Sequence, residues 1–156
     1  AKGIKKAFLK GNFAKALKEA DKLAEDEELG TEIGVMLRKM VADRVASYEA
    51  DLERGDVLKA YDGAKALASG IKGLPEEERI SALLKAISKD KAHKAALKAQ
   101  TKLIEISALE LRRKKDCDES IKQLEKLMKG FEGTRTGDLI GEVLKSVQVK
   151  KGKMAR

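Results

Sequence analysis

The chain has 156 residues and a formal net charge of +8, with 42% hydrophobic and 38% charged residues. This hydrophobic content excludes a disordered chain and favours one domain with its own core. A membrane-spanning helix is also excluded, because the sequence has no run of about 18 apolar residues. Helix-forming Ala, Leu, Lys and Glu dominate, so we predict an all-α protein.

Seven helical segments are expected along the chain, from apolar residues that recur at helical spacing. The fifth segment is long, and we expect it to kink or break near residues 88–90. The seven segments cover about residues 2–10, 12–25, 28–54, 56–69 and 75–114, a segment that begins at Asp116, and residues 133–147.

Polar residues mark several of the expected helix starts. Asn12 and Asp56 are predicted N-caps, whose side-chain oxygens accept a backbone N–H of the first turn. Asp116 and Glu119 are predicted to form a capping box. Pro75 suits the first turn of the fifth segment, where its missing N–H costs nothing.

One helix-pair pattern occurs three times in the sequence. In its first block, a polar cap residue is followed by an apolar residue, a small residue and further apolar residues at helical spacing. In copy order, the aligned positions are Asn12, Asp56 and Asp116; Phe13, Val57 and Cys117; Ala16, Ala60 and Ser120; Leu17, Tyr61 and Ile121; Ala20, Ala64 and Leu124; and Leu23, Leu67 and Leu127.

A second block follows the first in each copy. Copies two and three keep an offset of 60 residues through both blocks, including the connectors 70–73 and 130–133, which each begin and end with glycine. The aligned positions are Ile33, Met36, Leu37 and Met40; Ile80, Leu83, Leu84 and Ile87; and Ile140, Val143, Leu144 and Val147. We therefore predict one helical-repeat domain over residues 1–147, with repeat cores 11–41, 55–87 and 115–147, and a basic flexible tail at 148–156.

The first block resembles the middle of a tetratricopeptide repeat. Gly55, Asp56 and Ala60 stand where that family has a helix-ending glycine, a cap and a small residue, and residues 10–17 resemble the same segment. The connector 131–134 is similar to one that is common in bacterial extracytoplasmic repeat proteins. The resemblance implies antiparallel helix pairs stacked as a short right-handed solenoid. Its helices are expected to be unusually long, because the offsets here exceed the family period of about 34 residues.

For function, the resemblance implies a non-enzymatic protein–protein interaction or spacer module of a bacterium, with another protein as its partner. It favours a periplasmic or extracytoplasmic location over a cytoplasmic one, and the sequence itself leaves both open. The chain begins with Ala1, so we expect it to be processed or to be the C-terminal part of a larger protein. Residues 73–75 and 89–91 resemble helical extensions of thioredoxin-like proteins, which makes an accessory role in a redox protein one alternative. An exposed terminal face would also permit a homo-oligomer.

Catalytic and metal-binding motifs are absent from the sequence, so we expect no enzyme, no cofactor and no metal site. Cys117 is the only cysteine and aligns with apolar residues of the other copies, which predicts a buried structural thiol rather than a reactive one. His93 is the only histidine and lies among lysines, which favours a surface position over a ligand. Helix-start electrostatics explains the acidic runs 25–28 and 76–78.

Two basic segments are the candidate contacts for a polyanion, and a basic helical domain that binds nucleic acid is a second alternative function. Few aromatic residues are present to stack on bases, which weakens this alternative. We also expect residues 112–115 to end a helix, where cations complement the helix dipole. The candidate contacts are Arg112, Arg113, Lys114, Lys115, Lys150, Lys151 and Lys153, and Arg156 belongs to the same tail.

Overall fold

The computed structural model describes residues 1–154, which form eight α-helices and no β-strand. This confirms the prediction of an all-α protein. Within the described residues, no helix combines the length and the apolar character needed to cross a bilayer. The helices are α1 (Lys2–Leu9), α2 (Phe13–Ala24), α3 (Glu28–Glu53), α4 (Val57–Ala68), α5 (Glu77–Lys89), α6 (Lys91–Ser107), α7 (Lys114–Met128) and α8 (Arg135–Lys153).

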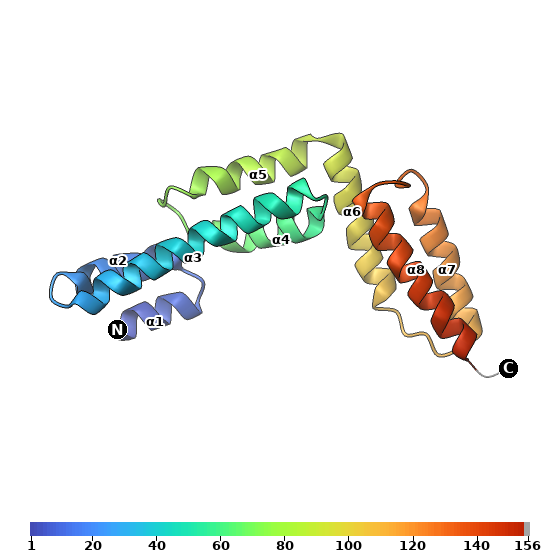
Figure 1. The fold of residues 1–156 in the computed structure, drawn as a ribbon, viewed down its shortest axis with the longest axis horizontal. Helices are drawn as coiled ribbons and strands as arrows, with labels where there is room; N and C mark the ends of the chain where they lie inside the picture. Colours follow the sequence, from blue (N-terminus) through green and yellow to red (C-terminus); the bar gives the residue numbers. More distant parts are fainter. Residues whose placement is uncertain (155–156) are drawn as a thin grey trace.

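The predicted break near residues 88–90 is confirmed and is sharp. Asp90 has an extended backbone between α5 and α6, and its carboxylate caps α6 by accepting a hydrogen bond from the His93 backbone N–H at 2.9 Å. The chain turns at this corner (Figure 1). The expected continuation to residue 114 is wrong, because α6 already ends at Ser107 and residues 108–113 form a connector.

Two predicted helix ends also differ from the structure. Helix α7 starts at Lys114, so Asp116 is its third residue and not an N-cap. Its carboxylate accepts hydrogen bonds from the backbone N–H groups of Arg113 (2.8 Å) and Arg112 (3.2 Å).

Helix α8 extends to Lys153, past the predicted end at residue 147. Lysine is a good helix former and complements the negative C-terminal end of the dipole, which explains the extension. Arg156 lies outside the described residues.

The repeat cores correspond to three antiparallel helix pairs, α2–α3, α4–α5 and α7–α8 (Figure 1). The aligned small and apolar positions of the first block share one environment, because the following nine side chains are all buried: Phe13, Val57, Cys117, Ala16, Ala60, Ser120, Ala20, Ala64 and Leu124. The alignment fails at Met36, which is 64% exposed although its counterpart Leu83 is buried. The N-terminal half of α3, which carries Met36, lies beside α2, whereas α5 in the second copy contacts α3, α4 and α6 (Figure 1).

The two connectors predicted to be equivalent adopt the same turn. Gly73 and Gly133 both have a positive φ, of 82° and 76°, which favours glycine at these positions. In each connector the residue after this glycine donates its backbone N–H to the carbonyl three residues earlier, from Leu74 to Ile71 at 3.0 Å and from Thr134 to Phe131 at 3.1 Å.

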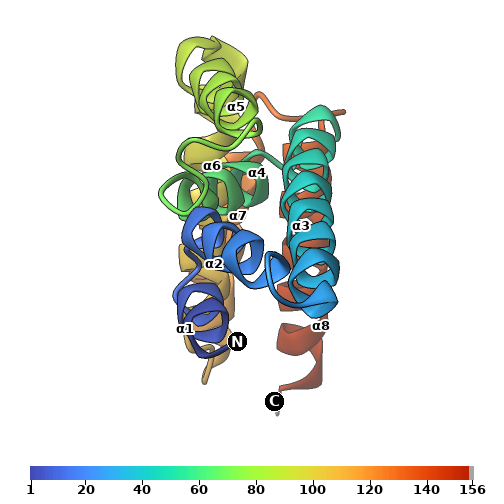
Figure 2. The same cartoon turned by 90° about the vertical axis from the view of Figure 1, so that its left-hand side faces the viewer.

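The buried side chains form two separate clusters, which divide the molecule into two lobes. The N-terminal lobe (residues 2–97) contains the first cluster, and the C-terminal lobe (residues 103–154) contains the second. Helix α6 contributes to both lobes, which follow one another along the long axis of the molecule (Figure 1). Viewed along that axis, α3 and α8 lie on one side and the remaining helices on the other (Figure 2).

We expect Ala60→Leu to destabilise the protein by about 1–3 kcal/mol, because Ala60 is fully buried at the small position of the repeat and a larger side chain overpacks it. Urea unfolding followed by circular dichroism measures this change. Ala66→Leu, at an exposed site on the same helix, is the matched control and should change stability by less than about 0.5 kcal/mol. Equal effects of the two substitutions would contradict the assignment of Ala60 to the core.

Candidate functional site

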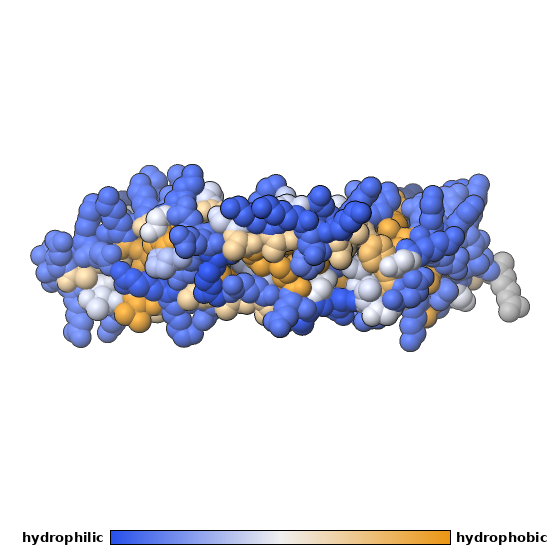
Figure 3. Space-filling view, turned by 90° about the horizontal axis from the view of Figure 1, so that it is seen from above, coloured by the Kyte–Doolittle hydropathy of each residue, from blue (hydrophilic) through white to orange (hydrophobic). Residues whose placement is uncertain are grey.

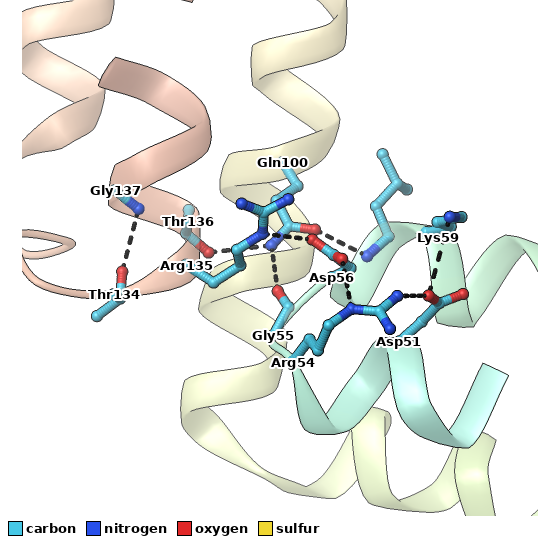
Figure 4. Close-up of polar contacts among 11 residues, drawn as sticks. Asp51, Arg54, Gly55, Asp56, Lys59, Gln100, Thr134, Arg135, Thr136 and Gly137 are labelled. Atoms are coloured by element: carbon cyan, nitrogen blue, oxygen red, sulfur yellow. Dashed lines mark hydrogen bonds and ion pairs between the residues drawn. The ribbon is translucent and has the colours of Figure 1, made fainter. Parts of the chain in front are cut away.

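One buried side chain connects three segments at the junction of the lobes. Gln100 on α6 is 4% exposed. Its Oε1 accepts a hydrogen bond from the backbone N–H of Leu58 at 3.0 Å, and its Nε2 donates to the carbonyl of Gly55 at 2.8 Å and to Oγ1 of Thr136 at 3.0 Å (Figure 4). These bonds join α6 to the turn between α3 and α4 and to the first turn of α8.

Glycine is required at position 55 for this junction. Its φ of +87° is strained for other residues, and a Cβ placed there would lie 2.8 Å from Cβ of Arg135. The missing side chain therefore lets the N-terminus of α8 approach the turn between α3 and α4, and it leaves the Gly55 carbonyl open to Gln100.

Asp56 occupies the N-cap position of α4, as predicted, but its carboxylate makes no capping hydrogen bond. Instead, Oδ1 accepts from Nε of Arg135 at 2.8 Å and Oδ2 from Nε of Arg54 at 3.4 Å (Figure 4). In its place, the side chain of Gln100 accepts the hydrogen bond of a backbone N–H in the first turn of α4, that of Leu58. The cap prediction was thus right about position and wrong about contact, because a distant arginine competes successfully for the carboxylate.

The two arginines set the acidity of Asp56. Partial burial alone would raise its pKa, but the hydrogen bonds and positive charges of Arg135 and Arg54 outweigh this and lower the pKa below the ordinary value of 3.8. Nearby, buried Asp51 pairs with Arg54 and, at 3.9 Å, with Nζ of Lys59. The turn is therefore held by a small network of charges (Figure 4).

A groove of about 370 Å³ opens beside this network, between α4, α6 and α8. Five of its lining residues are apolar, and among them Ile104 is 60% exposed while the other four are buried or half-buried. The lining also carries charges of both signs. The apolar lining is Leu58, Leu103, Ile104, Leu139 and Val143, and the polar lining is Asp56, Lys59, Gln100, Ser107, Arg135 and Glu142. We call this the junction groove.

Other surfaces fit an interaction site less well. A larger groove of about 650 Å³ lies beside α1, but lysines and turn residues line it and it has no apolar floor beyond Ala7. Seen from above, apolar residues form a discontinuous band along one face of the molecule, with charged side chains on either side (Figure 3).

The structure brings the two predicted basic segments to one end of the C-terminal lobe. Lys151 on α8 forms an ion pair with Asp118 on α7, and the sulfur atoms of Cys117 and Met154 lie 3.8 Å apart. We expected residues 112–115 to end a helix, where their cations would complement the helix dipole. This is wrong, because residues 112 and 113 precede α7 and residues 114 and 115 begin it. The dipole at a helix N-terminus disfavours cations, by about 0.3–1 kcal/mol each.

The only cysteine and the only histidine occupy structural positions. Cys117 is fully buried, which confirms the predicted burial of this thiol. His93 is half-buried at the α5–α6 corner, with Nδ1 3.3 Å from the carbonyl of Ala86, so it is less exposed than a surface histidine. Among residues 1–154, no group of three or more His, Cys, Asp or Glu side chains is placed to hold a metal ion.

No family model matches the sequence, and the comparisons with curated proteins and with solved structures find no similar protein.

The residues that build the junction were not predicted as a site from the sequence. Only Gln100 gives a local signal, because it stands on the buried face of α6 with Ala99, Leu103 and Ile106, where an apolar residue is expected. A polar residue on an apolar helix face indicates a buried hydrogen-bonding partner. Its partners come from residues 55–58 and 136, which no local pattern connects to it.

We expect Gln100→Ala to destabilise the protein by about 2–4 kcal/mol, because it leaves the Leu58 N–H, the Gly55 carbonyl and the Thr136 hydroxyl without this partner. Urea unfolding measures the loss. Gln123→Ala, at an exposed site on α7, is the control and should stay within about 0.5 kcal/mol of the wild type. A wild-type-like Gln100→Ala would show that the junction does not depend on this amide.

Because the folded state lowers the pKa of Asp56, its ion pairs stabilise the fold above about pH 4, and this contribution is lost as the pH falls through the folded-state pKa. Asp56→Asn should therefore be less stable than the wild type at pH 7, and the difference should shrink as the pH falls below about 4. Urea unfolding over a series of pH values from 7 downwards measures it. Asp62→Asn, on the exposed face of α4, should show no comparable convergence.

Proposed function

We propose that this chain is a non-enzymatic protein-docking module, built as a short right-handed stack of tetratricopeptide-like helix pairs, whose junction groove receives apolar side chains of a partner protein. The observation that carries the proposal is the exposed Ile104 in a groove that is lined by apolar residues and by charges of both signs. An apolar centre with a polar border is the usual anatomy of a protein interface. Large apolar side chains left exposed together in a concave site mark interaction surfaces.

Rigidity of the groove supports a docking role. Its walls come from α4, α6 and α8, and the hydrogen bonds of Gln100 and the Asp56–Arg135 ion pair hold these helices together. A preformed groove avoids the entropy cost of ordering its walls when the partner binds. The groove lining also includes one cation and one anion, Lys59 and Glu142, which favours a partner with apolar anchors and polar flanks of both signs.

The helix pairs support the tetratricopeptide-like assignment, because the two connectors share one turn and the first blocks share buried small residues. The proposed bacterial origin and extracytoplasmic location rest on the resemblance alone. A spacer role makes no use of the junction groove. The redox-accessory alternative is disfavoured, because the only thiol, Cys117, is inaccessible.

The test compares the proteins retained by three immobilised versions of the chain from a lysate of the native organism. We expect a discrete protein to be retained by the wild type and lost with Ile104→Asp, at least about 30-fold in affinity once the partner is purified, because a charge replaces a central apolar contact. Ile104 is 60% exposed, so the substitution should leave the fold intact.

Met36→Asp is the matched control, since Met36 is 64% exposed but lies in the N-terminal lobe. It should retain the same protein as the wild type. Retention that is equal for all three versions, or no retained protein at all, would overturn the junction groove as the docking site and leave the spacer role.

A further inference from the structure

One end of the C-terminal lobe concentrates positive charge. It is formed where α6 ends, α7 begins and α8 ends, by residues 108–119 and 147–154, and we call it the basic end (Figure 1). Contacts between Lys151 and Asp118 and between Met154 and Cys117 hold its two segments together. Its cations, which outnumber its four acidic residues, are Arg112, Arg113, Lys114, Lys115, Lys150, Lys151 and Lys153.

Three of these cations have partners within the basic end. Arg112 pairs with Glu110 at 2.8 Å, Arg113 with Asp116 at 3.1 Å, and Lys151 with Asp118. The other four, which form no ion pair among residues 1–154, are Lys114, Lys115, Lys150 and Lys153. Lys114 and Lys115 occupy the first turn of α7, where cations do not stabilise the helix. Helix stability therefore does not explain their presence.

Exposed apolar side chains accompany these charges. Leu109 in the α6–α7 connector is 50% exposed and Val149 on α8 is 49% exposed. No aromatic residue occurs in residues 108–119 or 147–154. Phosphate groups of a nucleic acid would use the cations but gain nothing from Leu and Val, and the bases would find no ring to stack on. Cations beside exposed aliphatic side chains match the headgroup layer of an anionic bilayer.

We propose that the basic end docks on the surface of an anionic lipid bilayer. The unpaired lysines contact the headgroup phosphates and carboxylates, and Leu109 and Val149 enter the boundary between headgroups and acyl chains. None of these six residues lines the junction groove, whose α8 residues Leu139 and Val143 lie in the N-terminal half of that helix. Lipid binding and protein docking can therefore be abolished separately.

The test is co-sedimentation of the full chain with vesicles of phosphatidylcholine alone or with about 30% phosphatidylserine, at low and high salt. We expect binding only to the phosphatidylserine vesicles, and we expect high salt to weaken it.

Each lysine near an anionic leaflet strengthens binding about fivefold. The combined variant Lys114→Gln, Lys115→Gln, Lys150→Gln and Lys153→Gln should therefore weaken binding by at least about 100-fold. The matched control makes the same charge change at exposed lysines of the N-terminal lobe and should bind within about threefold of the wild type: Lys2→Gln, Lys5→Gln, Lys18→Gln and Lys85→Gln.

Leu109→Ser with Val149→Ser separates a bilayer from a nucleic acid. This pair should weaken vesicle binding at least about fivefold, because the aliphatic contact is lost. Equal binding to both kinds of vesicle, or equal losses in the two lysine variants, would overturn the proposal. Binding to a 20-base-pair DNA duplex but not to vesicles, abolished by the four-lysine variant and unaffected by the Ser pair, would overturn it in favour of nucleic acid. Each variant is first checked by circular dichroism for an unchanged fold.

Discussion

The arrangement of the two lobes depends on the side-chain amide of Gln100. The apolar clusters on either side of it are separate, and helix α6, which carries this amide, has side chains in both. A hydrogen bond is directional, whereas the hydrophobic effect is not. The three hydrogen bonds of this amide connect α6 to the end of α3, the start of α4 and the start of α8. The Asp56–Arg135 ion pair adds a second directional contact across the same boundary. The walls of the junction groove are therefore positioned by polar contacts, although apolar side chains form part of its lining.

In the second copy, a break at Asp90 and a separate helix α6 follow the second block, where the first copy has only the rest of α3, and this longer segment accounts for most of the rise in the offset to 60 residues. In the first copy, the single 26-residue helix α3 pairs with α2 and continues along α4. In the second copy, α5 pairs with α4, and α6 packs on α7 and α8 after the turn at Asp90. The extra helix redirects the chain between the lobes. It also creates the junction groove, because one of the three walls is α6.

The sequence predicted the helix pairs because their determinants are local. Ala16, Ala60 and Ser120 are small where helices approach closely, and this pattern is visible without coordinates. Asn12 caps α2 as predicted, by accepting the Lys15 N–H at 3.0 Å. The candidate site was not predicted because its contacts are remote. Asp56 has the residue type and position of a cap, but its carboxylate forms an ion pair with Arg135, 79 residues away in the sequence. A local sequence pattern does not show whether a carboxylate will accept a hydrogen bond from a neighbouring backbone N–H or from a guanidinium far away in the sequence.

The two proposed surfaces share helix α8, and this has a geometric consequence. Leu139 belongs to the junction groove and Lys151 to the basic end, and a rise of about 1.5 Å per residue separates them by about 18 Å along one continuous helix. Antiparallel α7 packs along α8, which stiffens this connection. A partner in the groove would then be held at a fixed height above a bilayer that touches the basic end. The polar contacts of Gln100 and Arg135 would set the direction in which the N-terminal lobe extends from that surface. In this arrangement the rigid junction determines orientation, while the two surfaces supply the binding energy.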